Sequence, residues 1–217
     1  MAVELYDDHE QGERVRRWLQ SNGASIVLAV VLALGGVFGF QQYQSNQLNN
    51  QSAAANHFNT IQQLLDSDQL EMAEDYYERL ASVDQSGFYA LGTMAMATGY
   101  VNAGRLAPAV ALYQTLWDQS DMSSLRGLIG LRLARLLNGQ GDQQAALSIL
   151  SGAAPIGYAG AWAEARGDIH YDLGDMEQAR ASYQEALDAP DDMGFGTSLL
   201  QMKFDATGPG LTALESS

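Results

Sequence analysis

The sequence predicts an all-α protein, in which a single N-terminal transmembrane helix is followed by an α-solenoid of stacked helix pairs. Three observations support this prediction. Residues 24–40 contain no charged residue and no proline. Farther along, Ala73, Ala109, Ala146 and Ala179 recur 36, 37 and 33 residues apart, a period typical of helix-pair repeats. No segment of the sequence shows the sustained alternation of apolar and polar residues that indicates a strand.

Residues 1–23 precede the apolar stretch and are expected to form a cytoplasmic N-terminal arm. Arg14, Arg16 and Arg17 lie in this arm, whereas the next basic residue after the stretch is Arg79. Basic residues that flank a membrane span stay in the cytoplasm. We therefore take these three arginines as a topology signal, which predicts a single-pass protein with its N-terminus inside and its C-terminal domain outside.

Residues 24–43 are expected to form the transmembrane anchor. As a helix, residues 24–40 would be about 26 Å long at ~1.5 Å per residue, close to the ~30 Å thickness of a hydrocarbon core. Trp18 and Tyr43 flank the stretch, at the depth where aromatic rings favour the membrane interface. A cleaved signal peptide would need a small-residue site directly after the stretch, but the first such cluster begins at Ala53. An uncleaved anchor is therefore expected.

Small residues within the anchor favour close packing against another helix. Gly35 and Gly39 form a GxxxG pair, and Ser25, Ala29 and Ala33 follow one another at four-residue spacing. Small side chains let helix backbones approach closely in lipid. These five residues are candidate transmembrane packing positions, although many single spans carry such patterns without using them.

Residues 44–56 are either a linker or a helical extension of the anchor. They contain no charged residue, no proline and no glycine, a composition that favours helix. The repeat domain is expected over 57–205, ending in a short helix, TSLLQMKFD, that caps the open end of the stack. A flexible tail is expected over 206–217.

The repeat register is clearest between Trp162 and Pro190. Gly167 and Ala179 are small residues at the positions where two helices would cross, and Gly174-Asp175 forms the turn between those helices. This unit resembles a tetratricopeptide repeat, which places small residues at such crossings. Three upstream copies show the same register: Ala134, Gly141, Ala146, Leu150 and Ala153; Ala97, Gly104, Ala109, Tyr113 and Leu116; and, more weakly, Ile61, Leu64, Ala73, Tyr77 and Leu80.

The chain after the anchor is strongly acidic, and the whole chain lacks cysteine. From residue 41 onward, 8 Lys and Arg residues stand against 21 Asp and Glu residues. Such a field repels nucleic acid and anionic lipid, so neither is expected as a partner. It favours basic polypeptide partners, with a simple solvated acidic surface as the alternative. Without cysteine there is no disulfide, thiolate nucleophile or cysteine metal site.

No arrangement of residues indicates catalysis, a metal site or a cofactor. None of His9, His57 and His170 has a second histidine three or four residues away, as a helical metal site would require. Glu164 and Asp168 share a helical face, a spacing more typical of a solvated surface than of an acid–base pair. Nucleotide-binding and serine-nucleophile motifs are absent. We therefore expect no enzyme activity and no cofactor.

The first helix of each repeat pair is expected to line the concave side of the solenoid. Apolar residues beside a few charges on that side suit an extended or helical peptide segment. The candidate peptide-binding groove consists of Met94, Thr98, Val101, Leu131, Arg135, Glu164, Asp168 and Tyr171. The alternative is a shallow, solvated groove whose apolar residues pack beneath a capping element.

Short motifs along the chain also resemble one known family. They are Arg17-Trp18-Leu19 with Asn22-Gly23, LRLARL over 131–136, Arg166-Gly167 with Gly174-Asp175, and Met202-Lys203. Together they resemble the YfgM family, the ancillary subunits of the SecYEG translocon. The resemblance implies a bacterial inner-membrane protein with a periplasmic tetratricopeptide-like domain. It implies the SecYEG translocon and a periplasmic parvulin-type chaperone as partners, and it links the cytoplasmic side to an envelope-stress response regulator.

Two functions follow as expectations. The first is a membrane-anchored periplasmic scaffold or ancillary translocon subunit, which binds SecYEG and chaperone or exported client polypeptides during protein export. The alternative is an envelope-stress signalling regulator whose cytoplasmic arm sequesters a response regulator. Replacing residues 1–23 separates the two, because the exchange should abolish regulation but leave a scaffold role intact.

Overall fold

The computed structural model describes residues 7–84, 87–119, 124–189 and 197–208. The chain divides into two compact units, Met1–Ala53 and Ala54–Ser217. Every regular element within the described residues is a helix, and these residues contain no strand. The all-α fold class predicted from the sequence is confirmed.

The described residues of the first unit belong to one long helix, α1, which runs over Asp7–Asp66 and continues into the second unit. One segment of the described chain, Val27–Asp66, has the length and apolar composition to cross a membrane. No side chain in its most apolar part is buried against protein, and Leu32 and Phe38 are largely exposed. A core helix of a soluble protein would bury these residues, so the exposed apolar surface fits a lipid environment.

Residues 44–56 are helical and belong to α1. The absence of proline and glycine lets the helix continue, and its polar side chains bond along the surface, as between Gln42 Nε2 and Asn46 Oδ1 at 3.0 Å. Ala54 is already fully buried. The second unit therefore begins at Ala54, three residues before the start expected for the repeat domain.

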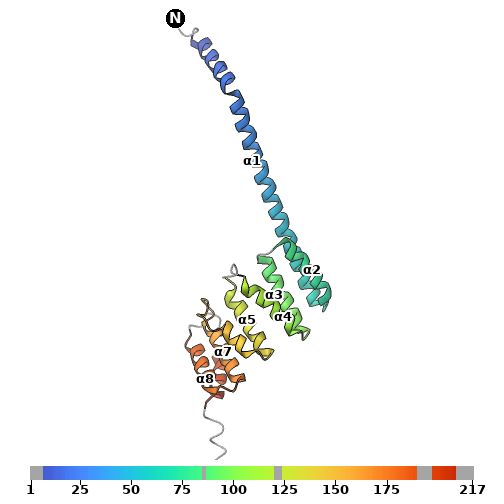
Figure 1. The fold of residues 1–217 in the computed structure, drawn as a ribbon, viewed down its shortest axis with the longest axis vertical. Coiled ribbons are helices and arrows are strands. Elements are labelled where there is room, and N and C mark those ends of the chain that lie inside the picture. Colours follow the sequence, from blue (N-terminus) through green and yellow to red (C-terminus); the bar gives the residue numbers. More distant parts are fainter. Residues whose placement is uncertain (1–6, 85–86, 120–123, 190–196, 209–217) are drawn as a thin grey trace, which may run out of the picture. The chain divides into compact units, whose positions relative to one another are not determined.

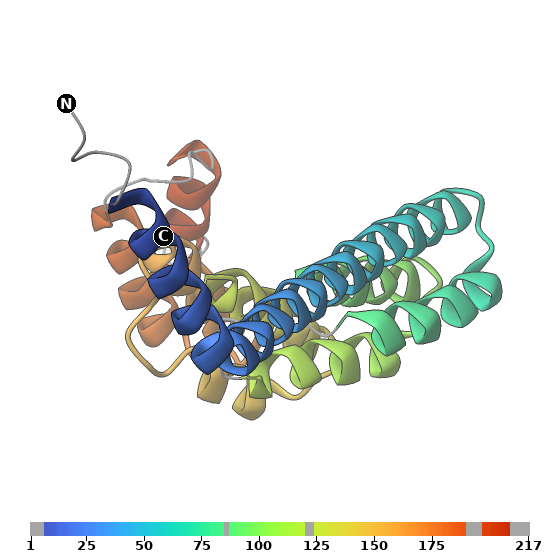
Figure 2. The same cartoon turned by 90° about the horizontal axis from the view of Figure 1, so that it is seen from above.

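The second unit is a stack of helix pairs. After α1 come α2 (Leu70–Val83), α3 (Gly87–Asn102), α4 (Leu106–Asp118), α5 (Arg126–Gly139), α6 (Gln143–Ile149), α7 (Ala159–Asp172), α8 (Met176–Asp188) and α9 (Thr197–Ala206). From α2 onward each helix contacts the next one in the chain, and α5 also contacts α7. Figures 1 and 2 show the helices following one another in this order, with paired helices running antiparallel. This is the α-solenoid that the repeat spacing predicts.

Residues in the left-handed backbone region make the turns within the helix pairs. Gly104, Gly141 and Gly174 have φ angles of 73°, 87° and 77°, which glycine adopts without a clash of Cβ. The corresponding residue in the first pair is Asp68, with a φ of 57°, and aspartate tolerates this region better than most residues. The missing glycine explains why the first repeat was the weakest in the sequence.

The predicted crossing positions lie in the core. Ala73, Ala109, Ala146 and Ala179 are fully buried. A Cβ atom added to Gly167 would collide with the ring of Tyr183 on α8. Two hydrophobic clusters form the core from α1 to α7: one joins the end of α1 to α2 and α3, and the other extends from α3 to α7.

The C-terminal end differs slightly from the expected boundaries. Helix α9 includes Ala206, the first residue of the expected tail. Residues 209–217 of that tail, and Pro190 in the last repeat, lie outside the described residues. The short helix expected over TSLLQMKFD is present as α9.

Candidate peptide-binding surface

The predicted groove residues come from α3, α5 and α7, the first helices of successive pairs. Two of them, Met94 and Leu131, are each only 7% exposed and belong to the larger hydrophobic cluster. They stabilise the stack and cannot contact a partner without repacking. Sequence spacing missed this because α3 and α5 carry apolar residues on several faces, so periodicity does not separate a groove position from a core position.

Four other predicted groove residues reach solvent. Thr98 and Val101 lie on α3, Arg135 lies on α5 and Tyr171 lies on α7. The hydroxyl of Thr98 donates to the carbonyl oxygen of Met94 at 2.9 Å. Arg135 forms no ion pair with any residue that the structure describes, so its charge is available to a partner.

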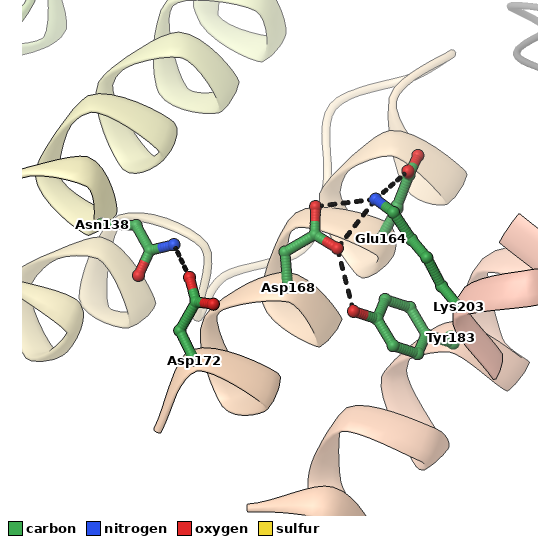
Figure 3. A network of polar contacts seen from close by, with 6 residues as sticks. All are labelled: Asn138, Glu164, Asp168, Asp172, Tyr183 and Lys203. Carbon is green, nitrogen blue, oxygen red and sulfur yellow. Dashed lines mark hydrogen bonds and ion pairs between the residues drawn. The ribbon is translucent and has the colours of Figure 1, made fainter. Parts of the chain in front are cut away.

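The remaining two predicted groove residues belong to a line of carboxylates on α7. Glu164, Asp168 and Asp172 follow at four-residue spacing and therefore share one helical face; we call them the acidic row. Figure 3 shows that the row meets side chains from three other helices. At its end, Asn138 Nδ2 of α5 donates to Asp172 Oδ2 at 2.6 Å.

Lys203 of α9 neutralises the other end of the acidic row. Its Nζ atom lies 2.6 Å from Glu164 Oε1 and 2.8 Å from Asp168 Oδ1 (Figure 3). The Tyr183 hydroxyl of α8 donates to the same Asp168 oxygen at 2.9 Å. The side chains of Glu164 and Asp168 are only 18% and 33% exposed. The sequence indicated a solvated carboxylate pair, but the structure has a partly buried pair held by a cation.

The pKa values fit this ion-pair arrangement. Partial burial lowers the pKa of Lys203, but hydrogen bonds to Asp168 and Glu164 outweigh that effect and raise the pKa above its ordinary value. Burial, followed by the negative charge of Asp168, raises the pKa of Tyr183. At neutral pH the lysine is therefore charged and the tyrosine is a neutral donor.

Helix α8 gives α9 a second attachment. The guanidinium carbon of Arg180 lies 3.7 Å from the centroid of the Phe204 ring, a cation–π contact. Arg180 Nη1 also donates to the carbonyl oxygen of Phe204 at 3.1 Å. On the outer side of α9, Leu199 and Met202 are 56% and 64% exposed. Charged side chains thus supply polar attachments of α9 to α7 and α8, and Leu200 and Phe204 of α9 are partly buried.

Sequence reasoning missed the role of Lys203, although one signal was available. Lys203 is the only lysine among the 217 residues. A lone lysine in a short terminal helix of an acidic chain indicates a specific partner, but the sequence does not show which carboxylates the helix meets. Their identity depends on how α9 folds back on α7 and α8.

Two of the three histidines lie beside other side chains of the repeat domain. His170 Nδ1 lies 3.9 Å from Asp175 Oδ2, and the ring of His57 packs against Tyr76. Among the described residues, no group of three or more His, Asp or Glu side chains is placed to hold a metal.

The anchor residues and the topology arginines lie on the exposed surface of α1. Ser25, Ala29, Ala33, Arg14 and Arg16 are exposed. Arg17 Nη2 lies 3.3 Å from Glu13 Oε2. A Cβ atom added at Gly35 or Gly39 would meet no described atom within 4 Å, so both glycines have open space beside them. Their use in helix packing remains a prediction.

Comparison with known families gives one match that spans both units of the chain. A family model described as a tetratricopeptide repeat-like domain matches residues 16–209. The chain belongs to this tetratricopeptide repeat-like family. The match includes the apolar part of α1 as well as the helix pairs.

Relatives of this tetratricopeptide repeat-like chain have one name in common. This chain is 28% identical over 190 residues to the ancillary SecYEG translocon subunit of Escherichia coli. The alignment covers 85% of this chain and 90% of the relative. The ancillary SecYEG translocon subunit of Neisseria gonorrhoeae is 24% identical to this chain over 208 residues, and the alignment covers 95% of this chain and 99% of the relative. The ancillary SecYEG translocon subunit of Aggregatibacter actinomycetemcomitans is 25% identical to this chain over 186 residues, and the alignment covers 86% of this chain and 91% of the relative. The resemblance to the YfgM family is confirmed.

Proposed function

We propose that this protein is a membrane-anchored periplasmic scaffold, which associates with the SecYEG translocon and binds polypeptides through its repeat domain during protein export. The observation that carries the proposal is the combination, on one chain, of an unburied apolar helix with a stack of helix pairs. Relatives named ancillary SecYEG translocon subunits match the chain over both parts. The fold is of a scaffold type and supports association more than catalysis.

The proposed orientation places the N-terminus in the cytoplasm and the repeat domain in the periplasm. Arg14, Arg16 and Arg17 precede the span, and no basic residue follows it until Arg79. Positive charge is retained on the cytoplasmic side. The repeat domain would then meet exported polypeptides as these leave the translocon, and it would also meet a periplasmic chaperone of the parvulin type.

The proposed binding surface is the exposed part of the predicted groove. Val101 and Tyr171 supply apolar area, because 37% and 43% of their surfaces are exposed. Arg135 supplies an unpaired positive charge among the described residues. Aromatic and arginine side chains contribute strongly to protein interfaces, so Tyr171 and Arg135 are the residues that we expect to anchor a bound segment.

Site-specific photo-crosslinking tests this surface. A photo-crosslinkable side chain at Tyr171 should capture SecYEG, a periplasmic chaperone or an exported polypeptide in intact membranes. Gln178 is the matched control, because it is also exposed but lies on α8, the second helix of the same pair. We expect much less capture from Gln178. Equal yields from the two positions would exclude this surface as the binding site.

A further inference from the structure

Helix α9 occupies part of the surface that the proposed function assigns to partners. Its only basic residue, Lys203, binds Glu164 and Asp168, two of the residues predicted to line the groove. Tyr171, one turn farther along α7, stays exposed. A peptide that contacts Tyr171 and extends along α7 therefore meets α9 at Asp168.

The attachment of α9 differs from that of the helix pairs. The pairs join through fully buried side chains such as Leu116, Ile129 and Leu150. No residue of α9 over 198–206 is buried, and Leu200 and Phe204 are only partly buried. Its polar attachments are the Lys203 ion pairs and the contacts of Arg180 with Phe204. Ion pairs that water reaches contribute little to stability. An element with few buried apolar contacts opens before the rest of a fold.

We propose that α9 is a releasable intramolecular ligand of the acidic row, and that a basic amphipathic helix of a partner polypeptide takes its place. This inference rests on the proposed function, since it assumes that partners bind along α7. The occupant is defined by what α9 supplies. It needs a lysine or arginine for Glu164 and Asp168, in the place of Lys203 (Figure 3), followed by an aromatic residue for the Arg180 guanidinium, in the place of Phe204.

Charge complementarity favours a basic occupant over a neutral one. The acidic row carries three carboxylates, and Lys203 is the one cation that binds them among the described residues. Tyr183 is neutral and only donates a hydrogen bond to Asp168. Removing α9 without a replacement leaves Glu164 and Asp168 without a cation. Water can solvate these two carboxylates once α9 has left, and their negative charge then attracts a basic helix in preference to a neutral one.

The single lysine provides a direct measurement of release. An amine-reactive acetylating reagent modifies only Lys203 and the N-terminus of the full-length chain, and mass spectrometry separates the two. The probe is an N-acetylated synthetic peptide of residues 197–208 carrying K203R, which competes for the acidic row but has no amine. A peptide of the same residues carrying K203Q is the matched control.

We expect saturating K203R peptide to raise the acetylation rate of Lys203 at least tenfold in the detergent-solubilised chain, and the K203Q peptide to leave it unchanged. An E164Q/D168N chain should be acetylated rapidly without any peptide. A D172N chain should behave like the parent, because Asp172 binds Asn138 and not Lys203.

Acetylation that stays slow with the K203R peptide would show that α9 is a permanent cap, and equal effects of the two peptides would show that charge does not select the occupant. The peptide comparison uses the unaltered chain, so it decides the question even where E164Q/D168N fails to fold. Crosslinking from Tyr171 without peptide-induced release would leave the proposed function intact and overturn this inference alone.

Discussion

Single side chains make polar links between neighbouring helices of the stack. The Tyr100 hydroxyl of α3 donates to Glu74 Oε1 of α2 at 2.7 Å. Tyr183 of α8 donates to Asp168 of α7, and Asn138 of α5 donates to Asp172 of α7. Each link joins residues that are far apart in sequence, and in each link the acceptor is a carboxylate. The acidic composition of the chain therefore contributes to the cohesion of the stack as well as to its surface.

The Tyr100 link predicts a loss of stability at alkaline pH. Burial, and then the hydrogen bond to Glu74, raises the pKa of Tyr100 from 10.0 to about 12. Its folded-state pKa lies above the unfolded value, so its contribution is complete below pH 10 and is lost as the pH rises from about 10 to 12. Tyr100→Phe should make the melting temperature fall less steeply across this interval, as followed by circular dichroism.

Tyr76→Phe is the control for this alkaline measurement, because Tyr76 lies nearby on α2 but its ring packs against His57. The steepness of its alkaline transition should match that of the parent. A Tyr100→Phe chain whose melting temperature falls as steeply as that of the parent would show that the Tyr100–Glu74 link does not cause the alkaline instability.

Residue-scale prediction from the sequence succeeded where one local rule decides the outcome. The crossing alanines and the turn glycines follow from the repeat register, because only small residues fit at a crossing and glycine suits a left-handed turn. Met94 and Leu131 were placed in the groove but lie in the core. The partner of Lys203 was not predictable, because it depends on how three helices pack together.

At the scale of elements, short turns and long helices follow directly from local sequence. Helix α1 continues through residues 44–56 because nothing there interrupts it. The pairs α3–α4, α5–α6 and α7–α8 are each separated by a turn with a glycine of positive φ. Caps reinforce two of these turns: the side chains of Asp142 and Asp175 accept hydrogen bonds from backbone amides at the starts of α6 and α8.

The two glycines at the end of α5 should respond oppositely to alanine. Gly141 has a φ of 87°, so Gly141→Ala should destabilise the domain by roughly 1–2 kcal/mol. Gly139 is an exposed residue within α5, and a Cβ there meets no atom within 4 Å. Gly139→Ala should therefore stabilise the domain by up to about 1 kcal/mol through helix propensity.

Thermal unfolding of both variants measures these effects under identical conditions. The two changes add the same methyl group two residues apart, so composition cannot account for a difference between them. Destabilisation by both, or by neither, would mean that the α5–α6 turn does not have the described backbone conformation.

At the scale of the whole molecule, the sequence predicted an apolar N-terminal helix followed by a stack of helix pairs, and the structure has both. The apolar stretch, the repeat period and the turn residues each report on local structure, and together they determine an anchor followed by a solenoid. The cytoplasmic location and the function of residues 1–23 stay predictions. Exchanging residues 1–23 for an unrelated basic segment should preserve translocon association, whereas a signalling role would be lost.

Membrane orientation gives a prediction for the full chain. A reporter enzyme that is active only outside the cytoplasm should be active when fused after Asn50 and inactive when fused after Gln20. The physical reason is retention of Arg14, Arg16 and Arg17 on the cytoplasmic side. The reverse pattern would overturn the periplasmic assignment of the repeat domain.

Isolation of the full-length protein from bacterial inner membranes, in a mild detergent and with identification of its partners, tests the central claim most directly. A chain in which an unrelated single span replaces residues 24–43 controls for recovery through the membrane alone. We expect SecYEG with the parent, together with a periplasmic chaperone or exported polypeptides bound to the repeat domain. Recovery of neither SecYEG nor any exported or periplasmic polypeptide would contradict the scaffold account.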